Sequence, residues 1–378
     1  MPNLSRGRVF LEDQATSRST TRRGGDALLG TRFAEGRNSL NALRLILAAT
    51  VIVSHSWWLG GYGPEPQPGG LKLGSWAVLG FFGISGYLIS MSRLRARRSL
   101  DYASARFFRI FPGLAVCVAV VAFVFAPLTA AATGNAYSIS GGLLFFITNL
   151  SAGTPGVAVA GIPGSLDGVH DPASWNGPLW TLFWEVVCYV LVGVVLRSLR
   201  PQLARVALLV PFVLGSAYVF TLDAGWGPVP TPPDWPLVPV LTFLAGSLTC
   251  LFRDSIPAHR TVIAVAAIAI AAVAGSGFAA SLVHVPLAVL LIMGSLFLPL
   301  AGKGTQPDLS FGLYIYGWPV QQMLAAAELP AYMPPPAFAA AALAATAPLA
   351  WMSWRGIESP AQLWSRARMS PSNKVGLA

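Results

Sequence analysis

Ten long apolar runs follow one another along the chain, separated by shorter polar connections. A helix needs roughly 20 apolar residues to cross a bilayer, and runs of that kind lie at about 39–59, 73–92, 109–132, 176–198, 205–222, 236–252, 261–278, 282–301, 309–328 and 336–354. A long loop follows the third run, and its segment at 138–150 is too short to span. The pattern predicts an all-α, polytopic membrane protein, a single bundle of about ten transmembrane helices, with 138–150 re-entrant or interfacial.

The composition agrees with a membrane protein and argues against a soluble one. Hydrophobic residues make up 54% of the 378 residues and charged residues only 11%, whereas soluble domains carry about 25% charged residues. The cysteines, Cys117, Cys188 and Cys250, lie in apolar runs without metal-ligand or redox spacing, so we expect small packing residues. No ligand cluster predicts a metal site, and no basic stripe interleaved with aromatics predicts nucleic-acid binding.

The basic residues predict the orientation. If the N-terminus is cytoplasmic, only Lys72 lies on the outer side. The cytoplasmic groups are then the N-terminal tail, the 93–108 loop, the 198–205 turn, Arg253, Arg260, Lys303 and the C-terminal tail. Cytoplasmic loops of multi-pass proteins carry an excess of Lys and Arg. We therefore expect a plasma (inner) membrane protein with both termini in the cytoplasm.

Polar tails flank one membrane domain. Residues 1–38 are rich in Arg, Ser, Thr and Gly and have no apolar core, which predicts a disordered basic cytoplasmic tail. Residues 39–362 are predicted to form the transmembrane domain, and 363–378 a cytoplasmic C-terminal tail. The first apolar run is of span length and lacks a cleavage pattern, which argues against a signal peptide.

Two ionisable residues share one face of the first run. Arg44 and His55 are eleven positions apart, which turns a helix three times plus about 20° and separates the two residues by about 16 Å along the axis. Ionisable residues inside a membrane are functional candidates. Arg44 alone is equally an interfacial residue reaching the headgroups, and His55 alone is equally a core histidine bonded to another helix. The shared face favours an anion site at Arg44 and an acid/base group at His55.

Glu185 and His284 are further ionisable residues within apolar runs. A buried, ionised carboxylate without a partner costs several kcal/mol, so Glu185 requires His55, an arginine or a proton. We predict that Glu185 contacts His55 and orients it, with a structural ion pair as the alternative. His284 lies near a helix end and is predicted to make a polar contact without acting in catalysis.

Two motifs have a spacing with structural meaning. The glycines of FFGISGY at 81–87 permit the close approach of another helix. Arg106 and Arg109, three positions apart in RFFRIFP, share a helix face at the cytoplasmic mouth of the third run. Paired guanidinium groups can clamp phosphates, and ordinary positive-inside anchors are the alternative interpretation.

Taken in order, the motifs resemble those of one family. They are Arg-x10-His in the first run, FFxxSGY in the second, RxxRIxP in the third, LWTLxWExxxY in the fourth, SFGLYIYGWPVQQ at 310–322 and ESP at 358–360. Over about residues 38–362 the chain resembles the acyltransferase-3 family, bacterial membrane-bound O-acyltransferases that act on surface glycans, glycolipids and related acceptors. One departure is visible. The family often has a histidine after the Tyr-Leu of the ninth-run motif, whereas this chain has Tyr316-Gly317-Trp318, so we assign no acid/base role there.

The resemblance implies that an acyl group, commonly acetyl, passes from cytoplasmic acyl-CoA to a hydroxyl of a carbohydrate, glycolipid or similar acceptor at the extracytoplasmic side. It implies no bound cofactor, with acyl-CoA (acetyl-CoA) as a co-substrate. Catalytic roles are expected for His55, Glu185 and Arg44, donor binding for Arg44, Arg106 and Arg109, and substrate binding for Trp180, Tyr189 and Ser85. Acceptor contacts are a weaker expectation for Asp167, His170, Asp171 and Trp175.

Two alternatives remain open at this point. His55 either takes the acceptor proton during direct transfer or carries the acyl group covalently. A proton-coupled secondary transporter or a lipid or glycan flippase would also use buried charges. The arginines aligned with Arg44 favour the CoA-dependent enzyme, and no repeat of the kind found in transporters is visible. A structural scaffold would leave the buried charges unexplained.

Overall fold

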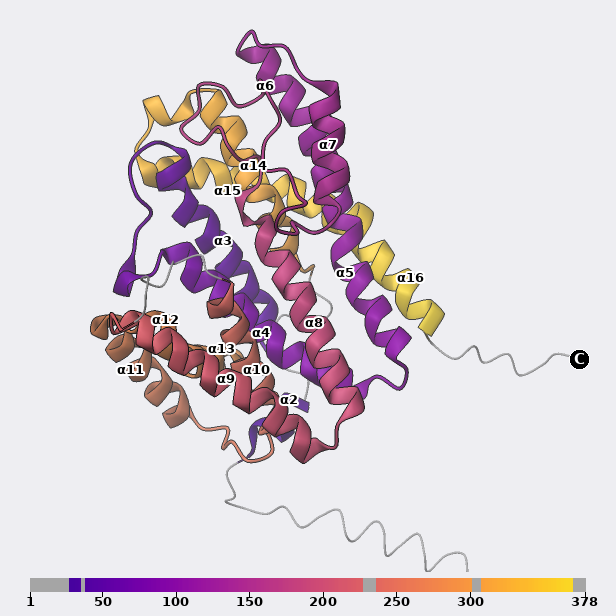
Figure 1. The fold of residues 1–378 in the computed structure, drawn as a ribbon, viewed down its shortest axis with the longest axis vertical. Coiled ribbons are helices and arrows are strands. Elements are labelled where there is room, and N and C mark those ends of the chain that lie inside the picture. Colours follow the sequence, from indigo (N-terminus) through magenta and orange to yellow (C-terminus); the bar gives the residue numbers. More distant parts are fainter. Residues whose placement is uncertain (1–26, 35–37, 227–235, 301–306, 370–378) are drawn as a thin grey trace, which may run out of the picture.

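The computed structural model describes residues 27–34, 38–226, 236–300 and 307–369, which form a bundle of helices (Figure 1). The helices are α2 (Leu29–Ala34), α3 (Leu40–Leu59), α4 (Leu73–Arg95), α5 (Ser99–Val120), α6 (Ala126–Ala132), α7 (Ile139–Asn149), α8 (Trp180–Ser198), α9 (Pro201–Asp223), α10 (Leu237–Leu251), α11 (Arg260–Ser276), α12 (Ala279–Leu282), α13 (His284–Phe297), α14 (Ser310–Ala326), α15 (Pro335–Ser353) and α16 (Ser359–Met369). π-helical turns at Val121–Phe125 and Trp354–Glu358 join α5 to α6 and α15 to α16. Within the described ranges no strand forms.

Every one of the ten apolar runs contains a helix, which confirms the all-α membrane fold. Six helical segments are long and apolar enough to cross a membrane: Leu40–Leu59, Leu73–Arg95, Ser99–Ala132, Gly177–Ser198, Pro201–Asp223 and Pro335–Arg368. The other four runs hold the shorter helices α10, α11, α13 and α14, of 14 to 17 residues. The protein is a multi-pass membrane protein.

The long helices run between two ends of the bundle. We call the end at which α3 begins the arginine end, because Arg44, Arg106 and Arg109 lie there. We call the opposite end, at which α3 finishes, the histidine end, because His55 and Glu65 lie there. These two ends give the bundle a polarity on which the site is built.

Helix α4 lies at the centre of the bundle and packs against α3, α8, α10 and α13. Its contact with α10 depends on glycine. A Cβ on Gly86 would meet the backbone of Phe243, and a Cβ on Gly246 of α10 would meet the backbone of Gly83. The two backbones therefore touch, which confirms the close approach predicted from FFGISGY.

The boundaries differ from the prediction at both ends of the membrane domain. Part of the predicted disordered tail is ordered, because α2 buries Leu29 and Phe33 and the Phe33 ring lies 4.8 Å from the ring of Tyr87. At the other end α16 continues past residue 362 to Met369, and it packs along α5. The rest of both predicted tails, residues 1–26, 35–37 and 370–378, and the predicted cytoplasmic Lys303 lie outside the described residues.

The long loop after α6 holds a short helix, α7, inside the predicted 138–150 segment. Its 11 residues extend about 17 Å at 1.5 Å per residue, too little to cross a membrane. α7 packs against α5 and the π-helical turn that follows α5. Figure 1 shows α6 and α7 near the top of the bundle.

Candidate active site

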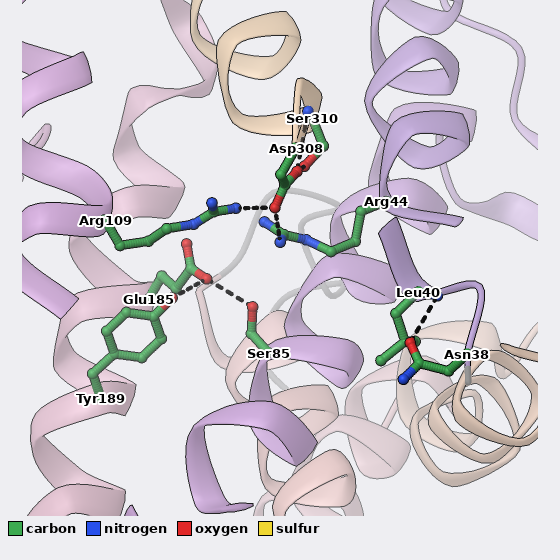
Figure 2. Close-up of polar contacts among 9 residues, drawn as sticks. All are labelled: Asn38, Leu40, Arg44, Ser85, Arg109, Glu185, Tyr189, Asp308 and Ser310. Carbon is green, nitrogen blue, oxygen red and sulfur yellow. Dashed lines mark hydrogen bonds and ion pairs between the residues drawn. The ribbon is translucent and has the colours of Figure 1, made fainter. Parts of the chain in front are cut away.

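At the arginine end, one carboxylate joins two of the predicted arginines. Oδ2 of Asp308 lies 2.6 Å from Nη1 of Arg44 on α3 and 2.6 Å from Nη2 of Arg109 on α5 (Figure 2). The other oxygen, Oδ1, accepts hydrogen bonds from the hydroxyl and the backbone N–H of Ser310 at the start of α14. Burial raises the pKa of Asp308, but the charges of Arg44 and Arg109 outweigh burial, so the pKa lies well below its usual range. Asp308 therefore fixes three helices around one ionised group.

In Figure 2, Arg109 and Arg44 flank Asp308, and Glu185 on α8 lies below Arg109. Its Oε1 accepts hydrogen bonds from the Ser85 hydroxyl on α4, at 2.8 Å, and from the Tyr189 hydroxyl one turn further along α8, at 2.6 Å. The predicted residues Ser85 and Tyr189 thus meet at Glu185. Their role in substrate binding stays a prediction, because both hydroxyls are already directed at this carboxylate.

At the histidine end, the carboxylate beside His55 is Glu65, and not Glu185 as predicted. Nδ1 of His55 lies 3.1 Å from Oε2 of Glu65, which also accepts a 2.5 Å hydrogen bond from Ser54. Glu65 belongs to the loop between α3 and α4, and this loop folds back over the end of α3. The predicted contact fails because His55 and Glu185 lie at different levels of the bundle, and each has its own partners.

The environment of Glu65 favours its ionised form. Burial raises the pKa of this carboxyl, but the hydrogen bond and charge of His55, the Ser54 hydrogen bond and the charge of Lys72 together lower the pKa to about 2. The backbone N–H of Gly74 on α4 donates to the Ser54 hydroxyl and holds it in place. The carboxylate therefore holds Nδ1 of His55 as a hydrogen-bond donor, which leaves Nε2 as the nitrogen available to a substrate.

Two neighbouring cavities lie between the level of His55 and the level of Arg44. The larger, of about 400 Å³, is lined by His55, Glu65 and three tryptophans, Trp58, Trp180 and Trp318. The smaller, of about 40 Å³, is lined by Arg44, Glu185 and Ser310, together with apolar side chains.

Val78, Thr181 and Tyr314 line both cavities, so the cavities meet at these three side chains. A 2.6 Å hydrogen bond between the Thr181 and Tyr314 hydroxyls lies at the junction. Arg44 contacts Asp308, in the connection before α14, and the His55 ring lies against the ring of Trp318 on α14. Both residues therefore face the α14 segment. This arrangement confirms that the two residues share one face of α3.

The predicted acceptor contacts in the outer loop have different outcomes. Trp175 is fully buried and donates to the Ser165 hydroxyl, so it is a core residue and the prediction is wrong for it. His170 and Asp171 contact Trp58, the former ring to ring at 4.6 Å and the latter through the indole N–H at 3.4 Å. They support one wall of the larger cavity. Asp167 lines a separate hollow beside α7.

Four further predictions concern residues outside the contacts described above. His284 is buried and its Nδ1 lies 2.8 Å from the Thr242 hydroxyl, a polar contact as predicted. All three cysteines are buried and free, in agreement with a packing role. Arg106 does not join Arg109 at Asp308. Its Nη2 donates to the Ser92 hydroxyl on α4, at 3.5 Å, and the residue also lines a small cavity between α5 and α16. Gly317 packs against Ile52, with no room for a side chain.

Sequence reasoning missed two carboxylates, Asp308 and Glu65. Within the described residues, each is the only acidic residue in the connection between its two helices. Glu65 lies between two prolines, and Asp308 follows a proline and comes two residues before α14 begins. Only the short distance of Asp308 from the SFGLYIYGW motif gave a sequence signal. For Glu65, no helical spacing relates a loop residue to His55, so the contact depends on how the loop folds.

A family model for an acyltransferase domain matches residues 37–355. The chain belongs to the acyltransferase-3 family. This acyltransferase is 31% identical over 296 residues to a protein named O-acetyl transferase from Shigella phage Sf6, which covers 76% of this chain and 85% of that protein. It is 31% identical over 173 residues to nodulation protein 10 of Rhizobium leguminosarum bv. viciae, which covers 43% of this chain and 45% of that protein. No solved structure matches it. The resemblance drawn from the motifs is confirmed, and the chain is an O-acyltransferase.

Proposed function

We propose that this O-acyltransferase moves an acetyl group from acetyl-CoA, entering at the arginine end, to a hydroxyl of a carbohydrate or glycolipid bound at the histidine end. The observation that carries the proposal is the pair of adjoining cavities. One holds Arg44 and the other holds His55, and they meet at Thr181 and Tyr314. The name of the phage relative supports acetyl as the acyl group.

The arginine end suits the donor. CoA carries a pyrophosphate and a 3′-phosphate, and arginine binds phosphates through two parallel hydrogen bonds. Asp308 and Glu185 offset two of the three positive charges of Arg44, Arg106 and Arg109, which leaves net positive charge at this end of the bundle. The narrow pantetheine arm would then extend from Arg44 through the smaller cavity toward Thr181 and Tyr314.

The cavity at the histidine end suits a sugar-containing acceptor. Trp58, Trp180 and Trp318 present aromatic surface, and the indole of Trp58 is 40% exposed. Aromatic faces bind the apolar faces of sugar rings while polar groups bind hydroxyls. The volume of about 400 Å³ lies within the usual range of small-molecule sites.

His55 acts as the general base in the proposed reaction. Glu65 holds Nδ1–H, and Nε2 takes the proton of the acceptor hydroxyl as the oxygen attacks the thioester carbonyl carbon. The carbon–sulfur bond then breaks, and the imidazolium returns the proton to the leaving thiolate of CoA. Glu65 stabilises the imidazolium, as the carboxylate of a hydrolytic triad does. The hydroxyls of Thr181 and Tyr314 stand at the junction, where they hydrogen-bond to each other and the Thr181 hydroxyl donates to the Pro178 carbonyl.

The orientation proposed for this reaction places the arginine end in the cytoplasm. The connections at residues 96–98, 199–200 and 252–259 share this end with the start of α3 and carry most basic residues of the described loops. The excess of Lys and Arg on one side favours a cytoplasmic assignment in the plasma membrane, with both termini inside. Acetyl-CoA is a cytosolic compound, so its entrance lies on the side that the charge distribution favours.

The proposal is tested with purified protein in nanodiscs, supplied with radiolabelled acetyl-CoA and with a glycan or glycolipid extract. We expect CoA release that depends on the extract and label that appears on a hydroxyl ester, which mild alkali removes. A parallel reaction in sealed proteoliposomes should proceed only when acetyl-CoA reaches the arginine end. Absence of both turnover and acetyl-CoA binding would contradict the proposal.

A further inference from the structure

Helix α16 and helix α5 enclose a small cavity at the arginine end that no step of the proposed reaction uses. The cavity has a volume of about 90 Å³ and is lined by Ala105, Arg106, Arg109, Gln362, Ser365 and Arg366. A water molecule occupies about 30 Å³ in the liquid. The space therefore matches a group of a few heavy atoms, such as a phosphate.

The two helices hold this cavity in a defined geometry. The hydroxyls of Ser104 and Ser365 lie 3.1 Å apart, and the rings of Phe108 and Trp364 meet edge to face at 5.0 Å. These contacts lie on either side of the cavity along α5. Its wall from α16 is therefore as firmly placed as its wall from α5.

Two of the side chains that line the cavity carry a buried hydrogen-bond donor without a partner in the described chain. Nε of Arg106 and Nε2 of Gln362 are buried without a hydrogen bond. A buried donor left without a partner costs about 1–3 kcal/mol, so a ligand that accepts both bonds would be strongly favoured. Nη2 of Arg106 donates a long hydrogen bond, of 3.5 Å, to the Ser92 hydroxyl on α4.

The charge of the lining points to an anion. Three arginines line the cavity, and no carboxylate is among the lining residues. Arg109 shares its charge with Asp308, whereas the described hydrogen bonds and ion pairs of the chain include none to Arg366. Like charges repel one another, and an anion bound in the cavity would reduce the repulsion among the three arginines.

We propose that this cavity is a phosphate site, in which Arg106, Gln362 and Arg366 bind a phosphate group of the acyl-CoA donor, so that α16 completes the donor entrance. This inference rests on the proposed function. An anionic lipid headgroup offers the same chemistry, and the experiment separates the two sources. Gln362 and Arg366 lie in a segment that the sequence assigned in part to a tail, and none of the motifs includes them.

The test compares Arg366→Gln and Gln362→Leu with wild-type protein in nanodiscs, using acetyl-CoA and S-acetylpantetheine, which lacks all phosphates. Arg366→Gln should raise KM for acetyl-CoA about tenfold and leave kcat within a factor of two, because a hydrogen bond to a charged group is lost. With S-acetylpantetheine the variant and the wild type should be equal. Arg368→Gln is the matched control, since Arg368 lies on the same helix but stacks over Trp364 at 3.7 Å.

The outcomes separate the inference from the proposed function. Equal KM values for acetyl-CoA in an active wild type and in Arg366→Gln would overturn the phosphate site alone, and so would an equal loss with both donors. If Arg366→Gln does not fold, Arg366→Lys and Gln362→Leu carry the same comparison. A response to phosphatidylglycerol that disappears in Arg366→Gln, with unchanged KM for acetyl-CoA, would support a phosphate site but assign it to lipid. No turnover of any donor by the wild type would contradict the proposed function itself.

Discussion

Replacement of Glu65 by glutamine tests the pairing that the structure places at the histidine end. Glutamine keeps the size of the side chain and its hydrogen-bonding positions, and removes a negative charge 3.1 Å from Nδ1 of His55. The cluster lowers the pKa of Glu65 from 4.5 to about 2 in spite of burial, and His55 makes the largest of the lowering contributions. At about 1.4 kcal/mol for each pKa unit, this lowering corresponds to about 3 kcal/mol by which the surroundings favour the ionised form of Glu65.

This interaction determines the expected size of the effect. The Glu65 charge stabilises His55 most when the imidazole holds the proton of the acceptor, which is the state reached in the transition state. Because Ser54 and Lys72 share in the 3 kcal/mol, we take this figure as the upper bound for His55, which corresponds to a loss of up to about 150-fold in kcat. The KM for acetyl-CoA should change little, since the donor binds at the other end of the bundle.

The assay is the initial rate of CoA release in nanodiscs at saturating donor and acceptor. Glu328→Gln is the matched control, because Glu328 is an exposed glutamate in the connection between α14 and α15, and its kcat should stay within a factor of two. A folded Glu65→Gln protein that keeps more than half of the wild-type kcat would refute the role of Glu65. A loss confined to Glu185→Gln would instead support the pairing expected from the sequence.

Three further predictions concern stability. Asp308→Asn should lower the free energy of unfolding by about 3–5 kcal/mol, because it leaves two partly buried arginines without their shared carboxylate. Thermal unfolding in nanodiscs measures this change. Asp254→Asn, at a carboxylate whose side chain is 74% exposed, should cost less than about 1 kcal/mol. Gly86→Ala should destabilise by about 1–3 kcal/mol, since its Cβ would meet the backbone of Phe243, and an unchanged melting temperature would refute that contact. Because the folded state lowers the pKa of Glu65, its contribution to stability is present above about pH 4.5 and is lost as the pH falls toward 2; in Glu65→Gln the melting temperature should fall less steeply over this range, and parallel curves would contradict the pKa.

The sequence was sufficient to predict the helices and to predict that Arg44 and His55 share one face of the first helix. Helical periodicity relates residues eleven positions apart on one chain segment, so the shared face followed from spacing alone. The close contact of α4 with α10 also followed, because glycines at 83 and 86 leave the backbone open on one side of α4. These features depend on local geometry, which a sequence specifies directly.

Contacts between segments distant in the chain could not be predicted in the same way. Glu65 reaches His55 because the loop after α3 folds back, and Asp308 reaches Arg44 across 264 positions. From the sequence we predicted that Glu185 pairs with His55, because Glu185 was the acidic residue inside an apolar run. In the structure the Glu185 carboxylate instead accepts a hydrogen bond from Ser85. The cost of burying a carboxylate correctly indicated that each acid needs partners, but it could not select them.

The measurement that tests the account most directly is acetyl transfer by His55→Asn. Asparagine retains a hydrogen bond to Glu65 but cannot accept the acceptor proton at neutral pH. With labelled acetyl-CoA and the acceptor extract in nanodiscs, we expect His55→Asn to bind acetyl-CoA normally and to lose at least about 100-fold in transfer rate, while His259→Asn, at an exposed histidine bonded to Thr261, keeps the wild-type rate. Transfer at the wild-type rate by a folded His55→Asn protein would contradict the central claim.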